Sequence, residues 1–461
     1  MKWQFGSQDG AASEVEIDEE GFAPQRITTF EVDEEAEKLL DLKTTIHRKL
    51  LDRINLSLLE RMSREQIEEE IGDIILALLL EEDAALNGAE RKRLTGEVLD
   101  ELLGLGPLEP LLADESITDI LVNGHRDVFV EKFGLLERAS VRFQDERHLL
   151  RIIQKIVSAV GRRVDESSPF VDARLADGSR VNAIVAPLAI DGSLLSIRKF
   201  AKTRIDMAKL VELGSVPEAV ADVLAAIVKS RRNVLISGGT GSGKTTLLNA
   251  LSANIDGRER IVTIEDSAEL QLQQEHVARL ETRPANIEGR GEVSQRDLVK
   301  NALRMRPDRI IVGEVRSGEA FDMLQAMNTG HDGSMTTVHA NTARDALSRV
   351  EQMIGMSGIE ISPTSARAQI ASAINVVVQI GRQADGRRRL LSLSEIVGME
   401  GQTITMQEIF RFKMEGRGED GSVLGRHEAT GIRPKFLDTA ADHGIALSPE
   451  LFRPNLDLGR V

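Results

Sequence analysis

The glycine-rich segment ISGGTGSGKTT, residues 236–246, places the strongest limit on the possible folds of this chain. It contains the spacing G-x-x-x-x-G-K-[ST] and lies between an apolar run, 233–236, and leucines at helical spacing in 247–251. A phosphate-binding loop needs this order of strand, loop and helix, because the glycines turn backbone N–H groups toward a phosphate and the helix N-terminus adds positive potential. The segment therefore predicts a nucleotide-binding loop in an α/β domain.

Two side chains of this segment carry the expected chemistry. Lys244 would reach the β- and γ-phosphates of a nucleotide, and Thr245 would hold Mg²⁺. The alternative is a glycine-rich turn with a surface lysine, and the flanking strand and helix patterns count against it. ATP and Mg²⁺ are therefore the expected cofactors. ATP is favoured over GTP because the chain has no N-K-x-D motif for reading guanine.

Two acidic segments are expected at the same edge of the sheet as the glycine loop. Glu265, Asp266 and Glu269 come at and just after the end of one apolar run, and a second run closes on Glu314. Ligands bind outside the carboxyl ends of parallel strands, so both segments should face one cleft. Asp308 begins its strand and lies roughly 20 Å from Glu314 at the usual strand rise. Glu314 is therefore the predicted metal-side carboxylate, and a solvated strand end is the alternative for any single acid.

Composition narrows the class of protein. The 461 residues include no Cys, which excludes disulfides, cysteine zinc sites and thiol chemistry. The net charge is −16, and residues 1–37 hold 11 acids and 2 bases, or −9 of that total. An acidic chain argues against a general duplex binder, so no nucleic-acid partner is expected. The N-terminus lacks an apolar signal region, and the longest aliphatic run, 74–80, is far too short for a membrane span, which predicts a cytoplasmic protein.

Changes in composition and periodicity along the sequence predict four regions. Residues 1–30 are acidic and aperiodic, as in a disordered tail. Residues 31–105 carry helical stripes and should form a small helical bundle. Short β-rich runs with one helix among them predict a mixed α+β domain over 106–205. From 206 to 461 strands and helices alternate, as in a doubly wound sheet built around the nucleotide loop.

The segment NTGHDGSMTTVHAN contains two histidines, His331 and His339. Two histidines without a nearby acidic pair or cysteine make a poor metal site. A polar sensor of the γ-phosphate is the functional alternative, and a structural role in the loop is the other.

Six segments in order resemble the secretion ATPases of type II and type IV systems, and more narrowly the TadA/CpaF branch that powers tight-adherence (Flp) pili. The similarity extends from about residue 100 to 410. One departure is Ser267, where many relatives have Pro, and this mildly favours the TadA/CpaF branch. The segments are DARLADGSRVNAIVAPL, SIRKF, GGTGSGKTT, TIEDSAEL, RPANIEGRGEVSQRDLVKNALRMRPDRIIVGEVR and AMNTGHDGSMTTVHAN.

The resemblance implies hexameric rings with an N-terminal domain hinged to a RecA-like P-loop ATPase motor. It makes Glu269 the base that polarises the attacking water, and it places Glu314 and Glu265 with Thr245 on the metal side. His331 and His339 would form the histidine box. It implies that Arg198 takes part in catalysis from the N-terminal domain. The implied nucleotide contacts are Gly238, Gly239, Thr240, Gly241, Ser242, Gly243, Lys244, Thr245, Thr246, Arg174, Arg180 and His339.

Residue chemistry and resemblance together predict an ATP-hydrolysing hexameric motor that assembles a type IV or tight-adherence pilus, with retraction as a further option. The resemblance implies inner-membrane platform proteins as partners, pilin as an indirect one, and a peripheral position at the inner membrane. A DNA-transfer motor of the conjugation type is the first alternative. A regulatory P-loop protein with little turnover is the second, and the presence of both Glu269 and Glu314 counts against it.

Overall fold

The computed structural model describes five stretches of the chain: residues 34–53, 64–82, 86–200, 205–285 and 290–460. The chain forms two compact units, 1–103 and 104–461. The acidic tail predicted for residues 1–30 lies outside the described residues. The domain boundary predicted at residue 205 borders on an undescribed segment and stays a prediction.

Three helices make up the described part of the smaller unit: α1 (Glu34–Arg53), α3 (Arg64–Glu81) and α4 (Gly88–Leu103). Helix α4 begins after Asn87, whose side chain accepts hydrogen bonds from the N–H groups of Ala89 and Glu90. The Glu90 carboxylate accepts one in return from the Asn87 N–H, which completes a capping box. The helices share a core whose fully buried members include Ile46, Leu50, Ile71, Ile75, Leu78, Leu94 and Val98.

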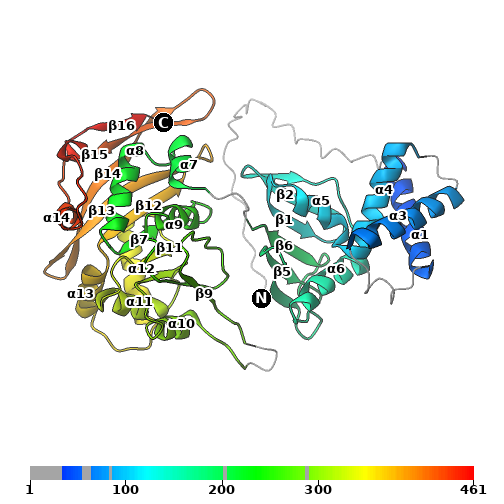
Figure 1. Cartoon of the computed structure of the whole chain (residues 1–461), viewed down its shortest axis with the longest axis horizontal. Helices are drawn as coiled ribbons and strands as arrows, with labels where there is room; N and C mark the ends of the chain where they lie inside the picture. Colours follow the sequence, from blue (N-terminus) through cyan, green and yellow to red (C-terminus); the bar gives the residue numbers. More distant parts are fainter. Residues whose placement is uncertain (1–33, 54–63, 83–85, 201–204, 286–289, 461) are drawn as a thin grey trace, which may run out of the picture. The chain divides into compact units, whose positions relative to one another are not determined.

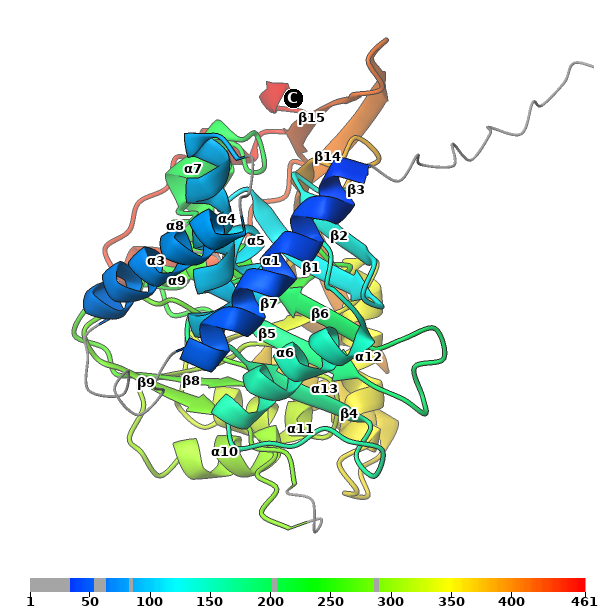
Figure 2. The ribbon, with the colours of Figure 1, turned by 90° about the vertical axis from the view of Figure 1, so that its right-hand side faces the viewer.

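The larger unit contains a six-stranded antiparallel sheet. Its strands are β1 (Ile117–Asn123), β2 (Asp127–Lys132), β3 (Leu135–Arg138), β4 (Phe170–Arg174), β5 (Arg180–Ile184) and β6 (Leu194–Arg198). They follow the order β3-β2-β1-β6-β5-β4. The short helices η1 (Gly106–Leu108) and α5 (Glu109–Ala113) precede the sheet. Helix α6 (Glu146–Ala159), capped by Asp145, lies on one face of this sheet (Figure 2). Its isoleucines belong to the hydrophobic core that it shares with the sheet.

A second, ten-stranded sheet fills the rest of the unit. Its strands are β7 (Val234–Ser237), β8 (Ile261–Glu265), β9 (Val277–Glu281), β10 (Arg309–Val312), β11 (Met335–Val338), β12 (Val376–Arg382), β13 (Arg388–Glu400), β14 (Thr403–Arg417), β15 (Val423–Ala429) and β16 (Asp457–Arg460). The order is β16-β15-β14-β13-β12-β7-β11-β10-β8-β9. Strands β12, β7, β11, β10, β8 and β9 run parallel, and β13 to β16 continue the sheet in antiparallel pairs.

Helices cover both faces of the second sheet (Figure 1). One core lies under α7 (Met207–Glu212), α8 (Glu218–Lys229), α9 (Lys244–Ser252), α14 (Phe436–Asp442) and η2 (Pro449–Phe452). The other lies under α10 (Gln295–Ala302), α11 (Glu319–Asn328), α12 (Ala343–Gly355) and α13 (Pro363–Ala373). Neighbouring residues of β7 divide between the two, since Val234 and Ile236 belong to the first core and Leu235 to the second.

The structure confirms a mixed α/β protein, now with two separate sheets. It differs from the doubly wound pattern expected up to residue 461, because no helix lies between β8 and β9 and the parallel part of the sheet ends at β12. Beyond β12, the strands β13, β14 and β15 follow one another without a helix between them, whereas α14 and η2 lie between β15 and β16. Short polar turns such as EGQ at 400–402 and GEDGS at 418–422 permit this, since antiparallel neighbours need only a hairpin connection.

A buried ion pair holds the start of β10. Arg309 is 1% exposed, and its Nε and Nη2 donate to the two oxygens of Glu259 at 2.7 and 2.8 Å. Its Nη1 also donates to the backbone carbonyl of Val228 at 2.9 Å. The guanidinium thus joins the strand to the end of α8 with most of its donors used.

We expect Arg309→Ala to lower the free energy of unfolding by about 3 to 5 kcal/mol, because it leaves a carboxylate and a carbonyl without their buried donor. Urea unfolding followed by circular dichroism measures the loss. The matched control is Arg304→Ala, which removes an exposed arginine from the preceding loop. Equal stability of the two variants would contradict a structural role for the pair.

Candidate functional site

The glycine loop occupies residues 238–243, between the end of β7 and the start of α9. Gly243, the residue before α9, has φ 94°, a left-handed conformation that favours glycine. Gly238 is restricted by space instead, since a Cβ there would lie 2.4 Å from the carbonyl oxygen of Ile380. The local chain therefore requires glycine at both ends of the loop.

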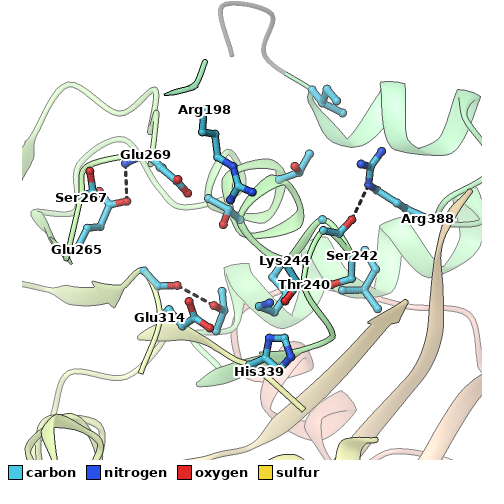
Figure 3. Close-up of a pocket in the computed structure, with 18 of the residues that line it drawn as sticks. Arg198, Thr240, Ser242, Lys244, Glu265, Ser267, Glu269, Glu314, His339 and Arg388 are labelled. Atoms are coloured by element: carbon cyan, nitrogen blue, oxygen red, sulfur yellow. Dashed lines mark hydrogen bonds between the residues drawn. The ribbon is translucent and has the colours of Figure 1, made fainter. Parts of the chain in front are cut away.

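The loop opens into a cavity of about 820 Å³. This volume lies within the range of small-molecule and cofactor sites. Figure 3 shows the side chains that converge on it from the glycine loop, the strand ends and the six-stranded sheet. The residues that line the cavity include Arg180, Arg198, Thr240, Gly241, Ser242, Gly243, Lys244, Thr245, Thr246, Glu265, Asp266, Glu269, Glu314, Arg316, His339 and Arg388.

Lys244 begins helix α9 and lies inside this cavity. Its Nζ donates a hydrogen bond to the carbonyl of Gly239, 3.1 Å away. Burial lowers the pKa of Lys244, and the nearby carboxylate of Glu314 partly opposes that shift. A partly desolvated ammonium with one neutral partner has donors and charge left for an anionic ligand.

Glu265 organises the acidic turn after β8. Its Oε1 accepts hydrogen bonds from the backbone N–H groups of Glu269 and Leu270, at 2.8 and 2.9 Å. Its Oε2 is buried and has no partner among the described residues. Burial raises the pKa of the Glu265 carboxyl group, and the two backbone hydrogen bonds oppose the shift. The next residue, Asp266, is also raised in pKa by burial, against the opposing charge of Arg316.

Three arginines of the six-stranded sheet lie side by side in the strand register. Arg174 pairs with Arg180, and Arg180 pairs with Arg198 on the next strand. Arg180 Nη2 lies 3.1 Å from Glu269 Oε1, and it donates to the backbone carbonyl of Ser267 at 2.9 Å. The six-stranded sheet therefore reaches the acidic turn of the second sheet directly.

The other two arginines of this row have different surroundings. Arg198 lines the cavity, with its Nε 3.1 Å from Asp119 Oδ1. Arg174 is not among the lining residues, and it pairs with Glu281 at 2.9 Å while donating to the Ser267 hydroxyl. Arg174 thus braces the acidic turn from outside, while Arg180 and Arg198 face the space where a ligand would lie.

Arg316 is a site residue that the sequence analysis missed. Its Nη2 lies 2.7 Å from Glu314 Oε2, and its Nη1 lies 3.5 Å from Asp266 Oδ2. Although burial opposes it, the hydrogen bond and charge of Glu314 and the charge of Asp266 raise the pKa of Arg316. The sequence signal for Arg316 is its position two residues after Glu314, because a cation there can contact both acidic segments.

The two histidines occupy opposite ends of β11. His339 follows the strand and lines the cavity. His331 precedes the strand and bonds through Nδ1 to the carbonyl of Ala326 at 3.2 Å. The structure therefore places His339, and not His331, among the residues that line the cavity.

The oxygens at the cavity suit a magnesium ion that arrives with a nucleotide. Within the described stretches no cluster of three His, Asp or Glu side chains can hold a metal by itself. The hydroxyl of Thr245 and the carboxylates of Glu314 and Glu265 do line the cavity, and Mg²⁺ prefers such oxygens together with substrate phosphates. These residues would hold the ion, which neutralises phosphate charge when bound.

A phosphate-binding loop beside strand-end carboxylates and arginines defines a P-loop nucleotide-binding protein. Residues 101–417 match the model of the family described as "Type II/IV secretion system protein". The chain belongs to this family of secretion ATPases and is an ATP-hydrolysing enzyme. No helix within the described residues has the length and apolar character needed to cross a membrane.

Similar proteins carry secretion and transfer names. A Mycobacterium tuberculosis protein named for conjugal transfer is 40% identical over 332 residues, covering 70% of this chain and 93% of its own length. The conjugal transfer protein TrbB of Rhizobium radiobacter is 35% identical, covering 63% and 86%. Among solved structures, the VirB11 ATPase of the Brucella suis type IV secretion system is 27% identical with a TM-score of 0.34, covering 63% and 95%.

The raised pKa of Glu265 predicts a pH-dependent cost to stability. The folded state binds the Glu265 proton more tightly than the unfolded state does, so this carboxyl stabilises the fold at low pH and loses that contribution as the pH rises through its folded pKa. We expect the Tm of Glu265→Gln, measured relative to the native chain, to increase between about pH 5 and about pH 7.5. Thermal unfolding at both pH values tests this, with the exposed Glu360→Gln as the control. A difference in Tm that falls with pH would contradict the burial argument.

Proposed function

We propose that this enzyme is the ATP-driven motor of a secretion system of the conjugal-transfer kind. The two relatives named for conjugal transfer, 40% and 35% identical, support this choice. They favour the DNA-transfer alternative over the pilus assembly that the sequence analysis put first. The observation that carries the motor function is the cavity itself, which combines Lys244, Glu269 and Glu314 with arginines from a separate sheet.

Each group at the cavity has a role in phosphoryl transfer. Lys244 and the N–H groups of the glycine loop bind the phosphates, with Thr245 and Glu314 on the metal side. Glu269 orients a water molecule and accepts its proton as the water oxygen attacks the γ-phosphorus. The bond from that phosphorus to the bridging oxygen breaks, which leaves ADP and inorganic phosphate. The chemistry needs positioning and charge neutralisation more than covalent help.

Own-chain arginines hold both key carboxylates in this structure. Arg180 lies on Glu269 and Arg316 lies on Glu314, at 3.1 and 2.7 Å. A γ-phosphate at the cavity offers a stronger, bidentate acceptor for a guanidinium. Binding of ATP would then draw Arg180 and Arg198 from carboxylates to phosphate and free Glu269 for the water. Because these two arginines belong to the six-stranded sheet, the exchange would move that sheet against the RecA-like motor domain.

Such movement does work only within a larger assembly. We infer a homohexameric ring, attached peripherally to the inner membrane, in which each stroke acts on membrane partners of the secretion system. The RecA-like assignment is supported by the parallel strands β12, β7, β11, β10 and β8, with the glycine loop after β7, which lies between β12 and β11.

Pilus assembly through an inner-membrane platform protein, with or without retraction, is the second candidate function. The chain's charge favours it, since the net charge is −16 and residues 1–37 contribute −9 through 11 acids and 2 bases. Such a chain is poorly suited to direct contact with DNA. The TadA/CpaF resemblance of the motifs supports the same candidate.

The site assignment predicts different effects for two substitutions in the cavity, with a third substitution as their control. Lys244→Ala should abolish ATP hydrolysis and weaken ATP binding strongly, because the phosphates lose their cation. Glu269→Gln should bind ATP and turn it over at less than about 1% of the native rate, since the water loses its base. Asp308→Asn is the control, because Asp308 lies at the end of β10 opposite to Glu314. There it is exposed and accepts a hydrogen bond from the Arg260 N–H. Phosphate release and calorimetric ATP binding measure these effects, and native rates in Lys244→Ala would overturn the assignment.

The two candidate functions differ in cells that carry Glu269→Gln as their only copy of this chain. If the motor serves conjugal transfer, delivery of a mobilisable plasmid falls to background while surface pilin stays at the native level. If it serves pilus assembly, surface pilin disappears and plasmid delivery is unchanged. An Asp308→Asn strain controls for expression of the substituted chain.

A further inference from the structure

The hairpin between β12 and β13 lies directly against the glycine loop. Strand β12 pairs with β7 up to the partners Gln379 and Ser237, and it then continues where β7 has ended. The next residue, Ile380, has its carbonyl against Gly238. The hairpin therefore forms one side of the loop, and its residues Gly386, Arg387 and Arg388 line the cavity.

A buried ion pair fixes the shape of this hairpin. Arg389 is fully buried, and its Nη1 lies 3.1 Å from Asp385 Oδ2. Asp385 also accepts hydrogen bonds from the N–H groups of Arg387 and Val423, both at 3.0 Å. Because successive residues of a strand point to opposite faces, a buried Arg389 directs Arg388 to the other face. That face is the one toward the glycine loop.

Arg388 touches the loop through a single neutral group. Its Nε donates to the carbonyl oxygen of Gly241 at 2.8 Å, as Figure 3 shows. Across the described residues, no carboxylate lies within 4.0 Å of Arg388, and neither of its Nη atoms makes a hydrogen bond. Arg316 and Arg180, by contrast, are both paired with acids. Arg388 thus brings an unneutralised charge to the wall of the cavity.

We propose that Arg388 is a positioning residue for the nucleotide, which rests on the glycine loop being the phosphate site. The Gly241 carbonyl belongs to the same peptide group as the N–H of Ser242. A guanidinium on that carbonyl polarises the peptide and strengthens the N–H as a donor to phosphate, since hydrogen bonds in a chain reinforce one another. The same bond holds the loop in one conformation before the ligand arrives, and the two Nη groups add positive charge beside the phosphates.

A positioning role predicts that loss of Arg388 affects ATP binding and not the rate of the chemical step. Arg388 contacts the loop and not the carboxylates that act on water, so its loss should raise KM for ATP and leave kcat nearly unchanged. A purely structural residue would instead lower the fraction of active enzyme and reduce kcat. Lysine at this position keeps the charge but lacks the fixed Nε fork, so it should restore part of the affinity.

The test measures ATP binding by calorimetry in the Glu269→Gln background, where ATP is not consumed, using the full chain. We expect Arg388→Ala to raise Kd for ATP about tenfold and Arg388→Lys about threefold, each a modest part of a charge-assisted hydrogen bond. In the native background, Arg388→Ala should raise KM about as much, with kcat within about twofold. Hydrogen exchange of residues 238–243 in the ATP-free Arg388→Ala protein should be faster than in the native chain.

Two controls distinguish the possible failures. Arg417→Ala removes an exposed arginine at the end of β14, away from the cavity, and should leave Kd unchanged. Lys244→Ala reports on the site itself. If Lys244→Ala weakens ATP binding and Arg388→Ala does not, the role of Arg388 is overturned while the nucleotide site stands. If neither variant affects ATP binding, the assignment of the nucleotide site is overturned together with the role of Arg388. A loss of kcat at unchanged KM in Arg388→Ala would show a structural role for Arg388 instead.

Discussion

Parallel pairing in the second sheet is the constraint on which the rest of the site depends. The strand register pairs Val312 with Ile264 on one side and with Thr336 on the other, and Val338 with Ser237. The strands therefore end together, and whatever follows each of them meets its neighbours at one edge. The glycine loop, both acidic segments and His339 reach one cavity for this reason, although about a hundred residues of sequence separate the first from the last.

The second determinant is the contact between the two sheets of the larger unit. Two neighbouring arginines, Arg174 on β4 and Arg180 on β5, form ion pairs with Glu281 on β9 and with Glu269 in the acidic turn after β8. Both also donate hydrogen bonds to Ser267 in that turn. These contacts are partly exposed, so they hold the sheets together weakly and can exchange partners. An interface made of a few exchangeable charges suits an enzyme in which an anionic substrate competes for the same cations.

The charges at the cavity are arranged in a way that costs stability. Burial raises the pKa of Glu265 and Asp266 and lowers the pKa of Lys244, so the charged form of each group is less stable in the cavity than it is in water. Such shifts gather where groups are held for a ligand and not for the fold. The Arg309–Glu259 pair, remote from the cavity, uses nearly all its donors internally and shows what a purely structural pair in the same unit looks like.

The amino-acid sequence alone determined the local elements whose signals are short in range. The spacing of Gly238, Gly243 and Lys244 indicated the loop, and the acids at the ends of apolar runs indicated the edge of the sheet. The tertiary structure decided what depends on residues far apart in the chain. It joined Arg316 to Asp266, laid Arg388 against Gly241, separated His331 from His339 along β11, and continued the parallel sheet as an antiparallel ribbon. Periodicity and spacing predict the backbone conformation over a few residues. The partner of a long arginine side chain depends instead on which strands pair and where each strand ends.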